Sequence, residues 1–126
     1  MADTPNAPQG SGLAPNLAGL LAYLVMPLTG ILFLMLEKRD PFVRFHAAQA
    51  TVVGAVLVVA WVALSVLSMV PFVGWLVGLL ASIALGFGGF VLWLFLMFQA
   101  FSGKEWELPW AGAQARRMMM GSALAR

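Results

Sequence analysis

The sequence has no cysteine, a single histidine and few charges: only 10% of its 126 residues are charged, whereas 62% are hydrophobic. The absence of cysteine excludes disulfides, thiolate zinc sites and a cysteine nucleophile. A soluble domain needs about 25% charged residues to cover its large surface, so the scarcity of charge excludes a soluble globular protein. A disordered chain is excluded too, because it needs low hydrophobicity. The net charge of +2 is too small to indicate nucleic-acid binding.

Long apolar runs are abundant, and they predict an all-α integral membrane bundle. We expect three transmembrane helices at about residues 17–36, 42–70 and 72–101. Each run reaches the roughly 20 residues that cross a hydrocarbon core of about 30 Å. Pro27 predicts a kink in the first helix, because proline removes a backbone hydrogen bond. Before the second helix, Asp40 suits the N-cap and Pro41 the first turn.

The two ends of the chain differ from the runs between them. Residues 1–16 are rich in proline and glycine and predict a flexible tail. Residues 17–103 form the predicted three-helix domain. Residues 104–126 combine aromatic, basic and methionine side chains, which favours a cytoplasmic tail that lies on the membrane surface or against a partner. A solvated end is the alternative.

The basic residues predict the orientation. All seven lie either between residues 38 and 44 or after residue 103. With three spans, both regions face the same side, so the positive-inside rule puts the C-terminus in the cytoplasm and the N-terminus outside. Two or four spans would divide the basic residues between the two sides. We therefore expect a multi-pass protein of the cell (inner) membrane, surrounded by the lipid bilayer.

The membrane-crossing parts of these runs contain no acidic or basic residue. Ion-coupled transporters and proton pumps generally need such groups, so their absence argues against an autonomous pump. Small residues recur every four positions in the third run, and a similar row lies in the second. In lipid, small residues let helices approach closely, which predicts helix packing within the chain or with a partner. The alternative is that small residues are simply common in membrane helices. The packing candidates are Gly54, Gly74, Gly78, Ser82 and Gly86.

Polar side chains gather at the predicted cytoplasmic ends of the second and third helices. Those of the second helix, Arg44, His46 and Gln49, are expected to contact lipid phosphates, backbone carbonyls or the acidic residues Glu105 and Glu107. Arg116 and Arg117 are expected near anionic lipid. A catalytic or metal-binding role for His46 would need partner residues that the sequence does not group around it. We therefore expect no catalytic, cofactor or metal site and no enzyme; a membrane enzyme using His46 is the alternative. The interface or lipid-contact candidates are Arg44, His46, Gln49, Lys104, Arg116 and Arg117.

Two segments carry a family resemblance: LEKRDPFVRFHAAQA, residues 36–50, and GKEWELPWAG, residues 103–112. Together they resemble a family of small bacterial and archaeal membrane proteins of unknown function, with the signature E-K/R-x-x-x-V-R-F-H-A-x-Q. That family is distantly similar to the Tic-twenty component of the chloroplast inner-envelope protein-import machinery. The resemblance implies a helical membrane protein and no assigned activity.

These observations lead to one functional prediction and one alternative. The first is a non-enzymatic accessory or scaffold subunit of a membrane complex, which contacts other membrane-protein subunits or further copies of itself. It follows from the absence of ionisable groups in the spans and from the small-residue rows. The alternative, which rests on the resemblance, is a Tic-like protein-translocation or channel component. No nucleic-acid partner is expected.

Overall fold

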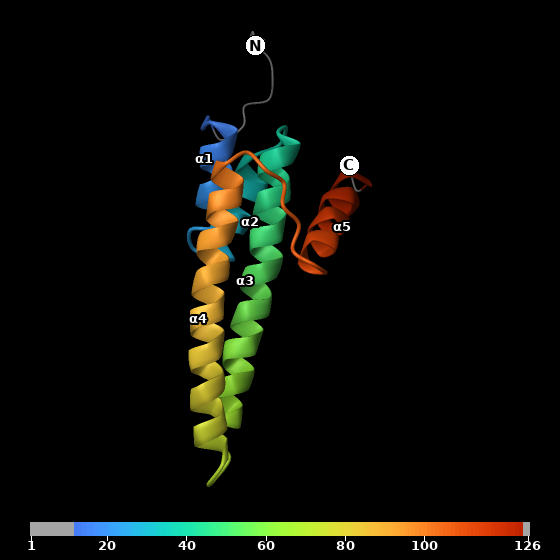
Figure 1. The fold of residues 1–126 in the computed structure, drawn as a ribbon. Helices are drawn as coiled ribbons and strands as arrows, with labels where there is room; N and C mark the ends of the chain where they lie inside the picture. The colour runs from blue at the N-terminus through green and yellow to red at the C-terminus, as the bar shows by residue number, and fades with distance from the viewer. Residues whose placement is uncertain (1–11, 125–126) are drawn as a thin grey trace.

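The computed structural model of the chain describes residues 12–124, in which every regular element is a helix. The predicted flexible tail, residues 1–16, falls mainly outside this range, as does Arg126. Figure 1 shows two long helices side by side, with three short helices at one end of the pair. In chain order the helices are α1 (Pro15–Ala22), α2 (Leu28–Leu36), α3 (Pro41–Leu67), α4 (Gly74–Phe101) and α5 (Ala111–Leu124).

Helices α3 and α4 form an antiparallel pair joined by a short turn. They have 27 and 28 residues, so each is about 40 Å long and exceeds the roughly 30 Å hydrocarbon core. Within residues 12–124 they are the two helices that are long and apolar enough to cross a membrane. Helix α3 ends at Leu67, three residues before the predicted end, because a turn around Pro71 separates it from α4. The Asp40 side chain caps α3 by accepting a hydrogen bond from the Phe42 amide at 2.9 Å, as predicted.

The predicted first span, residues 17–36, is divided into two short helices. Helices α1 and α2 have 8 and 9 residues, so each is about 12–14 Å long and covers less than half of a hydrocarbon core. Proline 27 lies directly before α2 and has no amide hydrogen to continue a helix. The hydroxyl of Thr29 closes the turn by donating to the Ala22 carbonyl at 2.8 Å and accepting from the Val25 amide at 3.1 Å. The described residues therefore contain two candidate spans rather than the predicted three.

Helices α1 and α2 form a hairpin against the first half of α3. In α1, Gly19 lies near Phe42 and His46, close to the start of α3, whereas the α1–α2 turn reaches Gly54. A Cβ atom on Gly54 would lie 2.5 Å from the backbone nitrogen of Pro27, so the turn contacts the α3 backbone. Helix α2 then returns towards the start of α3, and α1 begins at the same end of the α3–α4 pair where α2 finishes (Figure 1).

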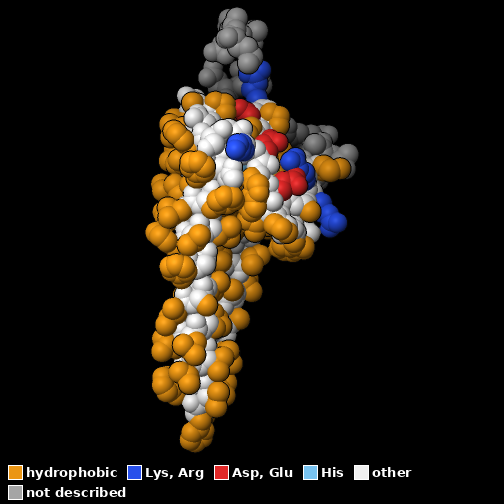
Figure 2. Space-filling model, in the orientation of Figure 1, with side chains coloured by type: hydrophobic (Ala, Val, Ile, Leu, Met, Phe, Trp, Pro, Cys, Tyr) orange, Lys and Arg blue, Asp and Glu red, His pale blue; other side chains and the backbone are white. Residues whose placement is uncertain are grey.

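This hairpin changes the predicted topology. The start of α1 and the end of α4 lie at the same end of the molecule, so the predicted placement of the two termini on opposite sides does not match the fold. Figure 2 shows the Lys and Arg side chains at this end, together with the acidic ones. With α1 and α2 folded as a hairpin, two spans leave both basic regions at the same end, so the positions of the charges do not by themselves require a third span. Which side of the membrane this charged end faces stays a prediction.

The buried core lies at the charged end. There, α1, α2, α4 and α5 surround the first half of α3, and the buried apolar side chains include Tyr23, Phe45 and Leu96. Towards the α3–α4 turn, the structure continues as α3 and α4 alone, and most of their large side chains are exposed. The molecule thus has a packed, partly polar head and an apolar two-helix stem (Figure 2).

Candidate functional site

The head contains a buried polar cluster centred on His46, which lies in the second turn of α3. Its side chain is fully buried, and three aromatic rings contact it edge to face. The ring centroids of Phe42, Phe45 and Tyr23 lie 4.6, 5.3 and 5.5 Å from that of the imidazole. Such a pocket excludes water, so each nitrogen of the imidazole needs a partner within the protein.

Both imidazole nitrogens have one. The Lys104 carbonyl oxygen lies 2.8 Å from Nε2. Because a carbonyl can only accept, Nε2 carries the hydrogen and donates it. The other nitrogen, Nδ1, then accepts from the Tyr23 hydroxyl, also at 2.8 Å. A doubly protonated ring would leave the hydroxyl hydrogen of Tyr23 without this acceptor, so the arrangement fits neutral histidine.

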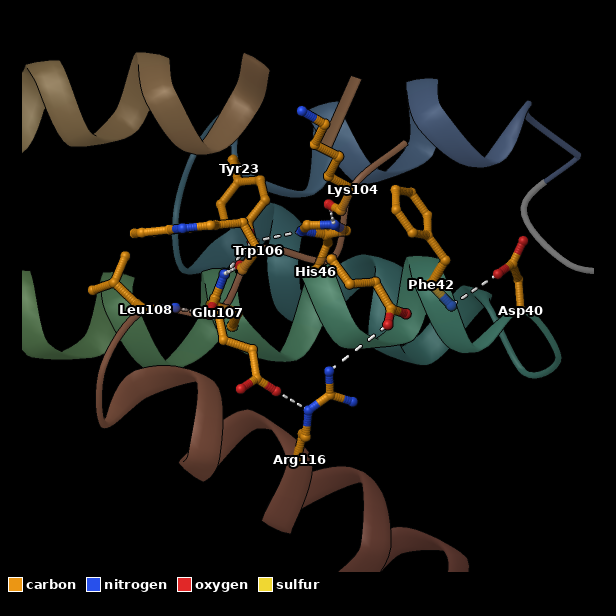
Figure 3. A network of polar contacts seen from close by, with 11 residues as sticks. Tyr23, Asp40, Phe42, His46, Lys104, Trp106, Glu107, Leu108 and Arg116 are labelled. Atoms are coloured by element: carbon orange, nitrogen blue, oxygen red, sulfur yellow. Dashed lines mark hydrogen bonds and ion pairs between the residues drawn. The ribbon is translucent and has the colours of Figure 1, made fainter. Parts of the chain in front are cut away.

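Gln49, one turn further along α3, extends the chain of hydrogen bonds. Its amide nitrogen donates to the Tyr23 hydroxyl at 2.9 Å and to the Trp106 carbonyl at 3.0 Å. Its amide oxygen accepts from the Leu108 amide at 2.9 Å. Every polar atom of this fully buried side chain is therefore bonded. Figure 3 shows how Tyr23, His46 and the segment after α4 converge on one place.

These bonds hold the irregular segment 103–110 against the helices. His46 and Gln49 bond its backbone at Lys104, Trp106 and Leu108, although they lie 57–59 residues earlier in the chain. On the other side of Tyr23, the indole nitrogen of Trp93 in α4 donates to the Tyr23 carbonyl at 2.7 Å. The cluster thus joins the α1–α2 turn, α3, α4 and the approach to α5.

Arg116 attaches helix α5 to the segment 103–110 and to α3. Its guanidinium forms a hydrogen-bonded ion pair with Glu107, lies 3.7 Å from a carboxylate oxygen of Glu105 and stacks 4.5 Å over the Phe45 ring. The hydrogen bond to Glu107 raises the pKa of Arg116 above its ordinary value. Arg116, an interface or lipid-contact candidate, is therefore paired with acidic side chains of the protein itself.

The other interface candidates are placed differently from one another. His46 and Gln49 are buried and bonded within the protein, so they do not reach lipid in this fold. Arg44 is half-buried. Its guanidinium donates to the Glu37 carbonyl at 2.7 Å and to the Leu34 carbonyl at 3.4 Å, both at the end of α2. The side chains of Lys104 and Arg117 are exposed.

The packing candidates also differ from one another in what surrounds them. Gly54 lies against the Pro27 backbone, and Gly74 and Gly78 are buried against the end of α3, where a Cβ would meet Leu67 and Ser68. Ser82 is half-buried. Gly86 is exposed, and a Cβ there would lie 3.8 Å from the Trp61 ring, an ordinary van der Waals contact.

The sequence analysis missed Tyr23, Trp93 and the backbone of residues 104–108 as members of the cluster. One signal for Tyr23 was available, since it is the only tyrosine of the chain and lies in an otherwise apolar run. Within residues 12–124 no group of three or more histidine, cysteine or acidic side chains is placed to hold a metal ion. The geometry therefore shows that the polar cluster holds the parts of the head together.

Comparisons with known proteins place the chain in a family. Residues 12–114 match the magnetosome magnetite crystal formation protein family. A UPF0132 membrane protein from Archaeoglobus fulgidus is 39% identical over 106 residues, which cover 84% of this chain and 96% of the relative. Two UPF0132 membrane proteins from Methanocaldococcus jannaschii are 39% and 35% identical; the alignments cover 80% and 84% of this chain, and 84% and 71% of the relatives.

The predicted similarity to small archaeal membrane proteins of unknown function is thereby confirmed, whereas none of these comparisons supports a similarity to the Tic-twenty component. No solved structure matches the chain. The relatives and the two long apolar helices agree that this is a membrane protein. Since the match to the family covers more than half of its residues, the chain belongs to the magnetosome magnetite crystal formation protein family.

Proposed function

We propose that this protein is a non-enzymatic scaffold subunit of a membrane complex, embedded by α3 and α4 in the cell (inner) membrane as a multi-pass protein. The observation that carries the proposal is the exposed apolar stem. Of the 28 residues of α4, only Gly74, Gly78, Leu96 and Ala100 are buried. A helix that its own chain covers so little must be covered by lipid or by other helices.

The head supports the same proposal. A scaffold needs a surface of fixed shape, and the hydrogen bonds of Tyr23, His46 and Gln49 fix the segment that leads to α5. Buried polar groups that are fully bonded rigidify a core and specify one arrangement. In a catalytic site, by contrast, the reacting atoms of such groups would face a substrate.

The family description adds a setting, because it names magnetite crystal formation. In that setting the protein would act through the membrane and its protein partners. The acidic side chains of the head support an action through partners and the membrane, because they already bond groups of the protein itself. Glu105 and Glu107 pair with Arg116, Asp40 caps α3, and Glu37 accepts from the Arg39 and Asp40 amides at 3.0 and 3.1 Å.

Site-specific photo-crosslinking in native membranes tests the scaffold role. A photoreactive amino acid at Phe87, 73% exposed in the stem, should form a discrete protein adduct, either with a second copy or with another subunit. The same amino acid is placed at Phe98, which is 65% exposed in α4 near the head, as the second crosslinking position. A chain that gives lipid adducts alone at both positions, and that has the mass of a monomer in native-lipid nanodiscs, would contradict the proposal.

Cysteine labelling tests the multi-pass arrangement separately. Because the sequence contains no cysteine, only the introduced cysteine can react. We expect single cysteines at Leu13 and Lys38 to share one accessibility to a membrane-impermeant maleimide in spheroplasts, and a cysteine at Phe72 to show the opposite one. The three-span arrangement predicts instead that Leu13 groups with Phe72. That result would show that α1 and α2 cross the membrane.

A further inference from the structure

A second feature of the head is a groove between α2, the start of α3 and α5. Its volume is about 230 Å³. Pockets that enclose a whole small molecule measure about 300–1,000 Å³, so this groove suits part of a larger ligand. The lining residues are Ile31, Leu34, Met35, Lys38, Arg44, Met118 and Met119.

The lining changes from apolar to cationic residues along α2. Ile31 lies towards the stem, as its neighbour Gly30 contacts Ala47 and Thr51 of α3, whereas Lys38 lies beyond the end of α2 at the charged end. Seven residues separate them, about 10 Å along a helix. The groove therefore runs from apolar to cationic in the same direction as the whole molecule runs from stem to head.

The charge in this groove is positive and uncompensated by its own lining, which includes no acidic side chain. Arg44 donates hydrogen bonds from Nη1 alone, to backbone carbonyls. Within residues 12–124 the ion pairs of the structure involve Arg116 instead. A guanidinium has five N–H donors, so Arg44 keeps donors for an anion. Lys38 is exposed beside it.

We infer that this groove binds an anionic phospholipid, with the phosphate between Lys38 and Arg44 and one acyl chain along Ile31 and Met35. The charge complementarity and the continuity of the groove with the exposed apolar face of α2 support this occupant. Basic pockets between helices are known to recognise anionic headgroups, and guanidinium groups suit phosphate oxygens. Met118 and Met119 supply adaptable walls, since methionine side chains fill irregular apolar spaces.

The lipid would have a structural consequence. It would lie between the end of α2 and the later part of α5, so it would connect the α1–α2 hairpin to α5. The inference is independent of the scaffold role: the groove can hold a lipid whether or not the stem meets other helices.

Native mass spectrometry of the full chain in detergent, titrated with phosphatidylglycerol or phosphatidylcholine, tests the inference. We expect one phosphatidylglycerol to bind with an affinity at least tenfold higher than that of phosphatidylcholine. Lys38→Glu should weaken it about tenfold or more, because the charge reversal replaces attraction by repulsion. Arg39→Glu is the matched control: it makes the same charge change one residue away, outside the groove lining, and should alter the affinity less than twofold.

The remaining outcomes each decide the question. Met118→Trp, at an exposed residue of the lining, narrows the groove without changing charge and should also lower the affinity, while hydrogen–deuterium exchange of the buried core of the head stays unchanged. Equal losses with Lys38→Glu and Arg39→Glu would overturn the inference, because they would show general surface attraction. Competition by water-soluble glycerol phosphate at the same concentration as the lipid would overturn it too, since the acyl chain would then contribute nothing.

Discussion

Replacing Gln49 with leucine tests the buried cluster most directly. Leucine has a similar size, but it cannot bond the Leu108 amide, the Trp106 carbonyl or the Tyr23 hydroxyl. Three hydrogen bonds at about 1 kcal/mol each sum to about 3 kcal/mol, and partners left unsatisfied in a buried site add to the cost. We expect the loss to fall on the attachment of residues 103–110 and α5, because two of the three bonds hold that segment.

Hydrogen–deuterium exchange in nanodiscs measures this loss locally. About 3 kcal/mol corresponds to an opening equilibrium roughly 100-fold more favourable, at about 1.4 kcal/mol per factor of ten. Peptides that cover residues 104–110 and α5 should therefore exchange about 100-fold faster in Gln49→Leu, whereas the middle of α4 should be unchanged. The Leu108 amide is the most informative probe, since its hydrogen-bond acceptor is removed.

The matched control is Gln99→Leu in α4. Its side-chain oxygen is buried without a hydrogen-bond partner among the described residues. Removing a buried unsatisfied acceptor costs nothing and relieves a penalty, so this variant should match or exceed the wild-type protection. If both glutamine variants gave equal exchange in residues 104–110, the cluster would not be what attaches the segment, and the reasoning would be refuted.

Two further substitutions test the hairpin and the start of α3. Gly54→Ala puts a Cβ within 2.5–2.8 Å of the backbone at Met26 and Pro27, so overpacking should lower the stability by about 1–3 kcal/mol. The thermal midpoint should fall. Gly88→Ala, where nothing lies within 4 Å, should leave the midpoint unchanged or raise it, because alanine favours the helix more than glycine does. Equal midpoints in the two variants would show that the turn does not dock at Gly54. Asp40→Ala removes the N-cap and should cost about 1 kcal/mol in a denaturing-detergent titration. Asp40→Asn should restore most of it, and equal losses in both would contradict the capping role.

Much of the architecture could be predicted because it depends on local composition. The apolar runs predicted α3 and α4 to within a few residues, since any 20-residue apolar stretch needs a hydrocarbon-like environment. Asp40 and Pro41 predicted the start of α3 from cap chemistry that acts within one helical turn. Residues 17–36 were predicted as one long helix and form two short ones, because length and hydropathy alone do not distinguish a continuous helix from a hairpin that turns back.

The candidate site was predictable in type but not in arrangement. Composition singled out Arg44, His46 and Gln49 as the polar residues of one helix end. The contacts of His46 and Gln49 depended on segments 23 to 59 residues away, and those of Arg44 on residues 7 and 10 positions earlier. Whether a polar side chain at a helix end meets lipid or protein is decided by what packs on it. For His46 and Gln49 the backbone of residues 104–108 occupies that place, and for Arg44 the end of α2 does so.

The sequence by itself determined that this protein belongs in a membrane, that its charges gather at one end and that its stem is apolar. These properties follow from counts and spacing, because burial of apolar surface and exclusion of charge from hydrocarbon act on each segment separately. Only the tertiary structure decided that residues 17–36 form two short helices that fold back on each other, and that His46 is an internal link rather than a lipid contact. Both depend on the close approach of distant backbones, at Gly54 and at Lys104, which no local pattern encodes.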